Sequence, residues 1–383
     1  MPFALFLLAL AVFVMGTSEF MLAGLLPALA ADLDVTIGVA GLLTSAFAIG
    51  MVVGAPLMAA FARRLPPRAV LLSCLLVFAA CHVIGAVTDD FPVLLATRVL
   101  SALANAGFLA VALATAATLV PSDRKGRAVA ILLAGTTLAT IAGVPGGALL
   151  GAAAGWRVTF WAIALLCIPA ALGIMRGIPN RSVHPSPAPR LRVELGQLVT
   201  PRLLLAMTLG ALINAGTFAA FTFLAPIVIG GPRLGEAWVP LVLVLFGVGS
   251  FVGVSIAGRL SDRHPGTVLA VGGALLFLGW IALALLASEP AALLALVFLQ
   301  GVLAFGVGST LITRVLYAAA NAPTMGGSYA TAALNLGAVA GPVLGILALE
   351  TGAGDVGPVW TAAVLTALAL GLAALRRRDL LGG

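Results

Sequence analysis

Long apolar stretches, separated by short polar segments, recur from one end of the chain to the other. A run of about 18 or more apolar residues is long enough for a helix to cross the hydrocarbon core of a membrane. From this pattern we expect helices at about 3–27, 37–60, 69–88, 91–113, 127–150, 158–175, 203–229, 238–258, 267–288, 291–317, 327–349 and 358–375. The pattern therefore predicts an all-α polytopic membrane protein with twelve transmembrane helices.

The composition agrees with a membrane protein and excludes an ordinary soluble one. Hydrophobic residues make up 62% of the 383 residues and charged residues only 9%, whereas soluble proteins carry about 25% charged residues. The first apolar run is similar to a secretory signal, but no Lys or Arg precedes it. It is also longer than the usual apolar core of a signal, about 7–15 residues, so we expect it to remain as the first helix.

The basic residues are distributed as the predicted topology requires. The net charge is +7. Of the 20 Lys and Arg residues, only Arg157 and Arg233 lie on the side of the membrane opposite the two termini, and Arg98 lies inside a span. All the others lie in segments on the side of the two termini. Because basic residues are retained on the cytoplasmic side, we expect both termini in the cytoplasm and the chain in the cell membrane. The positive charge therefore indicates topology, and no nucleic-acid partner is expected.

One long polar segment, residues 176–202, divides the chain. It is rich in Pro and Arg and lacks apolar periodicity, which is typical of a linker. We expect it to be cytoplasmic and to join an N-terminal six-helix bundle, 1–175, to a C-terminal six-helix bundle with a short tail, 203–383.

The two halves share short repeats. Three weak matches recur in the same order at an offset near 200, namely Gly16-Thr17 with Pro27 as Gly216-Thr217 with Pro226, 55–64 as 258–267, and 143–151 as 341–349. A fixed offset between similar stretches indicates internal duplication. The sequence therefore predicts two pseudo-symmetric bundles.

A duplicated twelve-helix chain with a basic central segment resembles the major facilitator superfamily. The resemblance implies that the substrate site lies between the two bundles, near the middle of the membrane. The stretches "GTSEFMLAGLLPALA", "GWRVTFWA" and "NAGTFAAFTFLAP" are similar to the twelve-helix drug:proton antiporters, and among them to the actinobacterial chloramphenicol efflux transporters. A neighbouring branch of the family, which exports sugars or purine nucleosides, has stretches similar to "GTSEF" and "GWRVTF".

Two charges inside the predicted spans are candidates for energy coupling. Glu19 and Arg98 lie about 12 Å and 10 Å from the outer ends of the first and fourth helices, so their depths allow an approach. At the repeat offset they correspond to Ala219 and Phe298, so the scaffold itself needs neither charge. Since charges inside a membrane usually mark a substrate or proton path, we expect Glu19 to couple protons to transport, with Arg98 as its charge partner. The alternative is a structural pair.

Amides and aromatic side chains are candidates for substrate contacts. On helices that the resemblance places around the cavity, they are Asn105, Phe108, Asn214, Phe218, Phe221, Tyr329 and Asn335. Such a mixture suits a moderately apolar ligand with a few hydrogen-bonding groups. Interhelical hydrogen bonding and core packing are the alternatives for each residue. For His82, in the third helix, we expect a satisfied polar contact near the outer interface, and the alternative is a proton relay.

Two further elements are gating candidates. The acid of the superfamily's loop motif is missing from the copy at 55–64 but present in the second copy as Asp262. Pseudo-symmetry implies that Asp262 faces the start of the fifth helix near Arg127, where the helix dipole stabilises a carboxylate. The alternative is a solvated loop charge. In the fifth helix, the residues Gly143, Pro145 and Gly147 form a small-residue face with a bend. This face serves either close helix packing or a hinge motion.

The spans contain no convergent set of His, Asp, Cys or Ser side chains, so we expect neither an enzyme nor a metal site. The expected function is proton-coupled efflux of a small, moderately apolar drug, most specifically chloramphenicol, by alternating access. Its partners would be the drug, protons and the lipid bilayer, with the chain acting as a monomer and no cofactor other than the proton gradient. The alternatives are export of sugars, purine nucleosides or a broader set of drugs, uptake, and a non-transporting membrane sensor.

Overall fold

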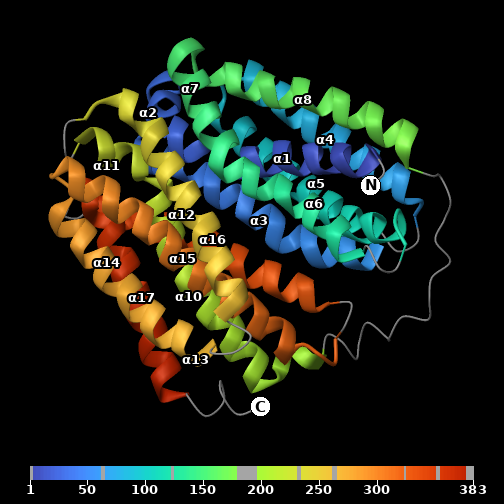
Figure 1. Ribbon diagram of the computed structural model, residues 1–383. Coiled ribbons are helices and arrows are strands. Elements are labelled where there is room, and N and C mark those ends of the chain that lie inside the picture. The colour runs from blue at the N-terminus through green and yellow to red at the C-terminus, as the bar shows by residue number, and fades with distance from the viewer. Residues whose placement is uncertain are drawn as a thin grey trace.

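The computed structural model describes residues 3–61, 65–121, 125–178, 196–230, 234–260, 265–322, 325–350 and 354–376. All regular secondary structure in these residues is helical (Figure 1). Twelve segments in them are long and apolar enough to cross a membrane. The protein is therefore an all-α multi-pass membrane protein, which confirms the prediction from the apolar runs.

Eight α-helices form the N-terminal half. They are α1 (Phe3–Phe20), α2 (Leu22–Asp32), α3 (Ile37–Phe61), α4 (Pro67–Val87), α5 (Phe91–Thr118), α6 (Lys125–Leu138), α7 (Val144–Ala154) and α8 (Trp156–Gly177). A π-helical segment, Ala139–Gly143, joins α6 to α7. Most of the predicted linker, 176–202, lies outside the described residues, and the chain is described again from residue 196.

The C-terminal half is built in the same way. Its helices are α10 (Pro201–Thr222), α11 (Leu224–Gly230), α12 (Val239–Leu260), α13 (Pro265–Thr267), α14 (Gly273–Leu286), α15 (Pro290–Ala318), α16 (Gly326–Leu349) and α17 (Gly357–Leu375). A second π-helical segment, Val268–Gly272, joins α13 to α14, and short 3-10 turns lie at Gln197–Val199, Glu236–Trp238 and Gly354–Val356.

Each half begins with a broken span where the apolar pattern predicts one continuous helix. The break lies at Met21, between α1 and α2, and at Phe223, between α10 and α11. Pro27 and Pro226 follow these breaks. A proline inside a helix lacks the N–H donor and crowds the carbonyl group four residues before it, so the turn before it opens. Pro226 lies three residues after Phe223 and accounts for the break there, whereas Pro27 lies six residues after Met21, inside α2, so the proline alone does not explain the first break.

The fifth span also departs from the predicted continuous helix, 127–150. It consists of α6, the π-helical segment and α7, and Pro145 lies at the start of α7. Because Pro145 cannot donate the backbone hydrogen bond of that turn, the helix widens locally into a π-helical segment. In the structure, a π-helical segment therefore stands where the sequence predicts a bend.

Each half has its own hydrophobic core. Buried side chains of α1–α8 form most of one cluster, and those of α10–α17 form most of a second. Figure 1 shows the two bundles side by side, one blue to green and the other yellow-green to red. Phe223 is buried in the first cluster, and Ala23 and Ala148 are buried in the second, so these three residues lie where the halves meet.

The halves meet along two pairs of helical segments. One pair is α3 with α16, the other is α12 with α7 and the π-helical segment before it, and α2 with α11 adds a smaller contact. The Ser45 hydroxyl donates a hydrogen bond to the carbonyl of Val339 at 3.0 Å. At Gly247 a Cβ atom would lie 2.4 Å from the carbonyl oxygen of Thr140, so only glycine allows this approach.

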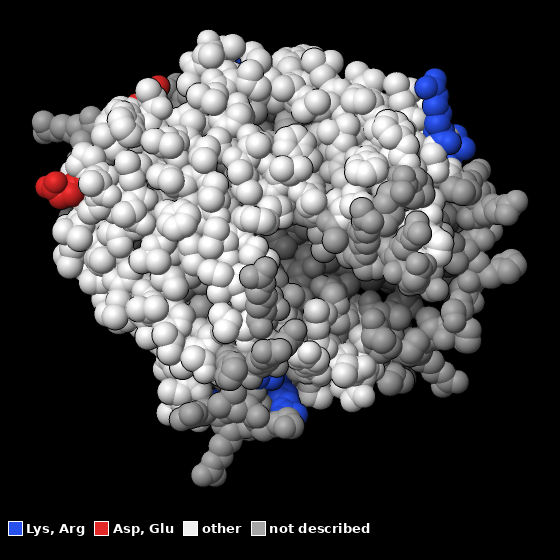
Figure 2. Space-filling view, viewed as in Figure 1, with Lys and Arg blue, Asp and Glu red and all other residues white. Residues whose placement is uncertain are grey.

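These contacts gather on one side of the bundle. Along α3, the residues that pack against the other half include Gly38, Gly41 and Ala48, in the part of α3 that follows α2 (Figure 1). The start of α1 and the end of α17, which are the described ends of the chain nearest its termini, lie on the opposite side (Figure 1). Figure 2 shows the surface hollowed near the middle of the viewed face. The halves therefore converge on the side away from the termini.

Candidate functional site

Arg98 is the buried cation at the centre of the N-terminal half. Its side chain is only 1% exposed, and α5 carries it to the face of α1. Its Nη1 donates to the hydroxyl of Ser18 and its Nη2 to the carbonyl oxygen of Ser18, both at 2.9 Å. The guanidinium carbon also lies 4.4 Å from the centre of the Phe47 ring. Arg98 therefore ties α5 to α1 and packs against α3.

Glu19 follows Ser18 directly and is partly buried. The ion pairs found among the described residues all involve Arg157, so Glu19 and Arg98 are not directly paired. The carboxyl group of Glu19 instead lies within electrostatic range of the positive charge of Arg98 and of the side-chain amide of Asn105. The structure thus brings the two charges close together without direct contact.

Asn105 lies on the same face of α5 as Arg98, because seven residues make about two helical turns. Its side chain is buried, and its Nδ2 also lies 3.6 Å from the sulfur of Met51. Phe108 is fully buried in the core of the N-terminal half. Of the two candidates on α5, Asn105 is therefore the one that lies beside Glu19.

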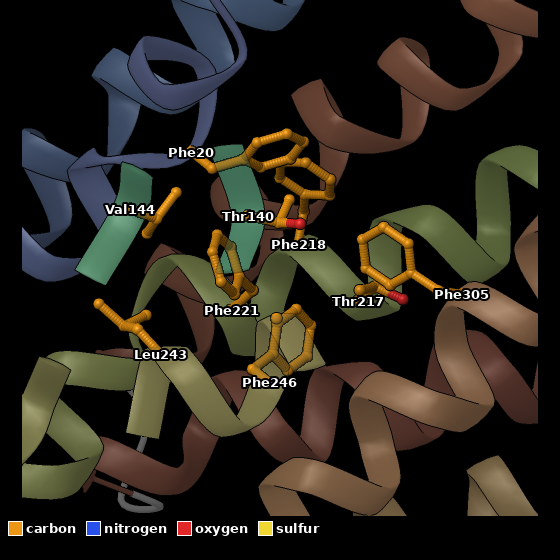
Figure 3. A pocket seen from close by; sticks show the side chains of 10 residues that line it. Phe20, Thr140, Val144, Thr217, Phe218, Phe221, Leu243, Phe246 and Phe305 are labelled. Carbon is orange, nitrogen blue, oxygen red and sulfur yellow. The ribbon is translucent and has the colours of Figure 1, made fainter. Parts of the chain in front are cut away.

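A pocket rich in phenylalanine lies where the two halves meet (Figure 3). We call it the phenylalanine pocket; its lining residues are Phe20, Thr140, Val144, Thr217, Phe218, Phe221, Leu243, Phe246, Gly247 and Phe305. Phe20, next to Glu19, comes from α1, and the four other rings come from the C-terminal half. The phenylalanine pocket therefore spans both halves and begins one residue from the candidate coupling carboxylate.

The rings of the phenylalanine pocket contact one another in series. The centroid of Phe20 lies 5.9 Å from that of Phe218 and 6.1 Å from that of Phe221. Phe221 stacks on Phe246 at 4.8 Å, and Phe246 meets Phe305 edge to face at 5.9 Å. Such pairs add to the stability of apolar packing by about 0.5–1.5 kcal/mol each. Sequence reasoning found two of these rings and missed the other three.

The remaining cavity candidates belong to the C-terminal half. Asn214 of α10 donates from Nδ2 to the carbonyl of Leu334 in α16 at 2.7 Å. Asn335 donates from Nδ2 to the carbonyl of Thr331 in its own helix at 3.0 Å. Tyr329 is 4% exposed and belongs to a small core cluster of α10, α15 and α16. These three side chains do not line the phenylalanine pocket.

The gating candidates are only partly described. Asp262 lies outside the described residues, and nothing is described of the side chain of Arg127 in α6. At Gly143 a Cβ atom would lie 2.0 Å from the hydroxyl oxygen of Thr17, so this glycine lets the fifth span press against α1. Near Pro145, Gly147 accepts a hydrogen bond from Thr159 of α8 at 2.9 Å.

A charged cluster, which sequence reasoning did not single out as a site, lies at the start of the "GWRVTFWA" stretch. Arg157 pairs with Asp32 and, at 2.5 Å, with Asp89. The indole of Trp156 donates to Asp32 at 3.0 Å. Hydrogen bonds from Arg157 and Trp156 hold the pKa of Asp32 below its ordinary value of 3.8. This cluster joins the end of α2 and the α4–α5 loop to the start of α8.

Within the described residues no group of three or more His, Cys, Asp or Glu side chains is placed to hold a metal ion. Twelve spans in two bundles, with a pocket between the bundles, are the architecture of a membrane transporter. A family model described as the Major Facilitator Superfamily matches residues 8–332. The chain belongs to this family.

Relatives of the chain include other transporters of the family. Over 372 residues it is 63% identical to a "Chloramphenicol resistance protein" of Streptomyces lividans, with 97% of this chain and 95% of that protein covered. It is 32% identical over 352 residues to the "Inner membrane transport protein YdhP" of Escherichia coli K12, with 92% and 90% covered.

Two solved structures share the fold. The human organic anion transporter MFSD10 (TETRAN) superposes with a TM-score of 0.65 at 20% identity, over 97% of this chain and 100% of that one. A bacterial homologue of the human lysosomal transporter Spinster superposes with a TM-score of 0.74 at 16% identity, over 99% and 96%. Both support the arrangement of two six-helix bundles.

Proposed function

We propose that the protein exports a small, moderately apolar drug of the chloramphenicol type in exchange for protons that bind at Glu19. The observation that carries the proposal is the position of this carboxylate. It lies within the bundle, interacts with the charge of buried Arg98 and is next in sequence to Phe20 of the phenylalanine pocket. The relative with 63% identity, a chloramphenicol resistance protein, supports the choice of substrate.

The lining of the phenylalanine pocket favours an aromatic, apolar substrate over a sugar. Its two hydroxyl groups are engaged with backbone carbonyls, because Thr140 donates to Thr137 and Thr217 donates to Ile213, both at 2.9 Å. Few donors therefore remain for the many hydroxyl groups of a sugar or nucleoside. An aryl ring, by contrast, gains the ring contacts that the phenylalanines already make with one another.

The side on which the two halves close determines the order of steps in the proposed transport cycle. The halves converge away from the termini, and the basic residues favour a cytoplasmic position for the termini, so the drug enters from the cytoplasm in this form. Separation of Ser45 from Val339 opens the outer side. A proton from outside then neutralises Glu19 and weakens its hold on the drug. Asp262 near Arg127 is our candidate latch for closing the cytoplasmic side.

One chain contains both walls of the phenylalanine pocket, so the proposed transport unit is a monomer. It uses the proton gradient as its energy source and needs no other cofactor. An enzymatic step plays no part in this scheme, because the substrate leaves unchanged.

The test is the Glu19→Gln variant, which keeps the shape of the side chain and removes its charge. We expect it to reach the membrane, to lose chloramphenicol resistance in a drug-hypersensitive host, and to lose proton-driven efflux in everted vesicles. The control Glu19→Asp keeps an ionisable group and should retain part of the transport. Wild-type resistance and efflux in Glu19→Gln would overturn the proposal, and drug accumulation in vesicles of known orientation separates efflux from uptake.

A further inference from the structure

A buried polar network lies behind the coupling site and joins three helices. Ser18 of α1, His82 of α4 and Arg98 of α5 are 0%, 2% and 1% exposed. The hydroxyl oxygen of Ser18 lies 2.9 Å from Nη1 of Arg98 and 2.7 Å from Nε2 of His82. On its other side, His82 Nδ1 lies 2.7 Å from the carbonyl oxygen of Phe78.

The donors and acceptors in this network can be assigned from their chemistry. A carbonyl oxygen only accepts hydrogen bonds, so the proton of the His82 ring is on Nδ1 and points to Phe78. A guanidinium only donates, so the Ser18 oxygen accepts from Arg98 and is free to donate its own proton to Nε2 of His82. The network is therefore complete with His82 neutral. A second proton on His82 would set two cations against one hydroxyl group.

His82 is the fixed end of the network. Its ring centroid lies 4.3 Å from that of Phe78 and 5.6 Å from that of Phe160. Packing between two aromatic rings holds the imidazole in one orientation. The position of Nε2 then fixes the rotation of the Ser18 hydroxyl, and this hydroxyl fixes Nη1 of Arg98.

Arg98 has capacity for a further partner. Its Nε is buried and has no hydrogen-bond partner among the described residues. Both terminal nitrogens bind Ser18, while Glu19, one residue further along α1, interacts with Arg98 only through its charge. If the hydroxyl of Ser18 turned away, the guanidinium would lose one of its two bonds to Ser18, and an ion pair with Glu19 would become the better alternative.

We propose that His82 is a positioning residue of the coupling site. It holds the Ser18 hydroxyl so that Arg98 stays beside Glu19 without forming an ion pair with it. Glu19 can then exchange a proton during each cycle. Without His82, Arg98 pairs with Glu19 and keeps the carboxylate ionised, so the transporter still exchanges drug across the membrane but no longer uses the proton gradient.

The test compares two transport modes of the full-length protein, with chloramphenicol as the probe. Proton-driven efflux needs coupling, whereas drug-for-drug counterflow needs only drug binding and alternating access. We expect His82→Leu to keep counterflow and to lower proton-driven efflux about fivefold, as for loss of a typical hydrogen bond between two neutral groups. His82→Gln, whose amide oxygen can accept from Ser18, should retain both. An equal fall in both modes for His82→Leu, or no fall in either, would overturn the proposal.

A double-variant comparison shows whether His82 acts through Ser18. Ser18→Ala deletes one oxygen atom and should lower proton-driven efflux as His82→Leu does. Adding His82→Leu to Ser18→Ala should then change efflux by less than about twofold, since residues in one network are not additive. Effects that multiply would contradict the proposed path. If His82→Leu does not reach the membrane, unchanged proton-driven efflux in Ser18→Ala overturns the proposal by itself.

This inference rests on the proposed function, and Glu19→Gln separates their failures. If proton-driven chloramphenicol efflux persists in Glu19→Gln, coupling at Glu19 is wrong whatever His82 does. If Glu19→Gln loses that efflux while His82→Leu and Ser18→Ala keep it, only the role of His82 is wrong.

Discussion

Arg98 binds Ser18 through both terminal nitrogens, one on the hydroxyl group and one on the carbonyl oxygen, at 2.9 Å each. Successive residues on a helix point about 100° apart, so Ser18 meets the guanidinium while Glu19 leaves α1 in another direction. A positive charge thus lies near the carboxylate without neutralising it in an ion pair. This relationship underlies the predictions for the coupling site.

Replacing Arg98 by lysine should strongly weaken coupling although the charge is kept. A lysine presents a single ammonium group and cannot reproduce the planar, two-pronged contact with Ser18. We expect Arg98→Lys to lower proton-driven chloramphenicol efflux by about tenfold or more, the cost of a hydrogen bond to a charged group. Arg176→Lys, at an exposed arginine of α8, is the control and should leave efflux unchanged. Full efflux in Arg98→Lys would show that the charge alone suffices.

The stacked pair Phe221 and Phe246 should contribute to drug affinity. In Phe246→Leu the ring is lost while most of the apolar volume stays. A ring contact of about 0.5–1.5 kcal/mol corresponds to a rise of roughly 2- to 13-fold in the chloramphenicol concentration for half-maximal efflux. Phe251 lies on the same helix and is 49% exposed, so Phe251→Leu is the matched control. Equal shifts in both variants would contradict a substrate role for the phenylalanine pocket.

Closure of the side away from the termini should depend on Gly247. A Cβ atom there would press on the carbonyl of Thr140, so Gly247→Ala should separate the halves on that side. A cysteine introduced at Ser45, which is buried where the halves meet, reports this opening, because the three native cysteines are buried.

We expect Gly247→Ala to increase labelling of that cysteine by a membrane-impermeant thiol reagent added from the side away from the termini. Gly146→Ala adds its Cβ atom to open space and serves as the control. If the two variants label at the same rate, Gly247 is not needed for closure.

The cluster around Arg157 should contribute to stability in a pH-dependent way. The hydrogen bond from Arg157 lowers the pKa of Asp32 in the folded protein. The contribution is therefore present above the ordinary Asp value of 3.8 and is lost as pH falls through the lowered folded value. Because this pair is exposed, Asp32→Asn should lower the Tm at neutral pH by less than about 3 °C.

Thermal unfolding of the detergent-solubilised protein at a series of pH values measures this effect. The Tm difference between wild type and Asp32→Asn should shrink in acid and at high salt. A difference that stays constant down to pH values below the lowered pKa of Asp32 would show that the charge of Asp32 does not stabilise the fold.

The fold could be predicted from the sequence because the membrane imposes a strong rule. Each span must be a long apolar helix, and the twelve apolar runs satisfy it. The breaks at Met21 and Phe223 were not predicted, since a proline in an apolar run is compatible with a kinked helix as well as with a broken one. Only local packing decides between them.

The site could be predicted less completely. Glu19 and Arg98 stand out because charges are rare in apolar helices, but depth along a helix says nothing about the direction of a side chain. The hydrogen bonds of Arg98 to Ser18 were therefore not foreseen. Phe246 and Phe305 line the phenylalanine pocket but give no sequence contrast within their apolar surroundings. Of the three rings that sequence reasoning missed, only Phe20 could have been found from the sequence, because it directly follows Glu19.

The central claim is that drug binding and proton binding compete at Glu19. It is tested most directly by adding chloramphenicol to the purified protein in weakly buffered solution and measuring protons released. The account predicts that the wild type releases protons as the drug binds, and that Glu19→Gln still binds drug but releases none. Glu289→Gln, at an exposed carboxylate, should release as many as the wild type. Undiminished proton release from drug-bound Glu19→Gln would contradict the account.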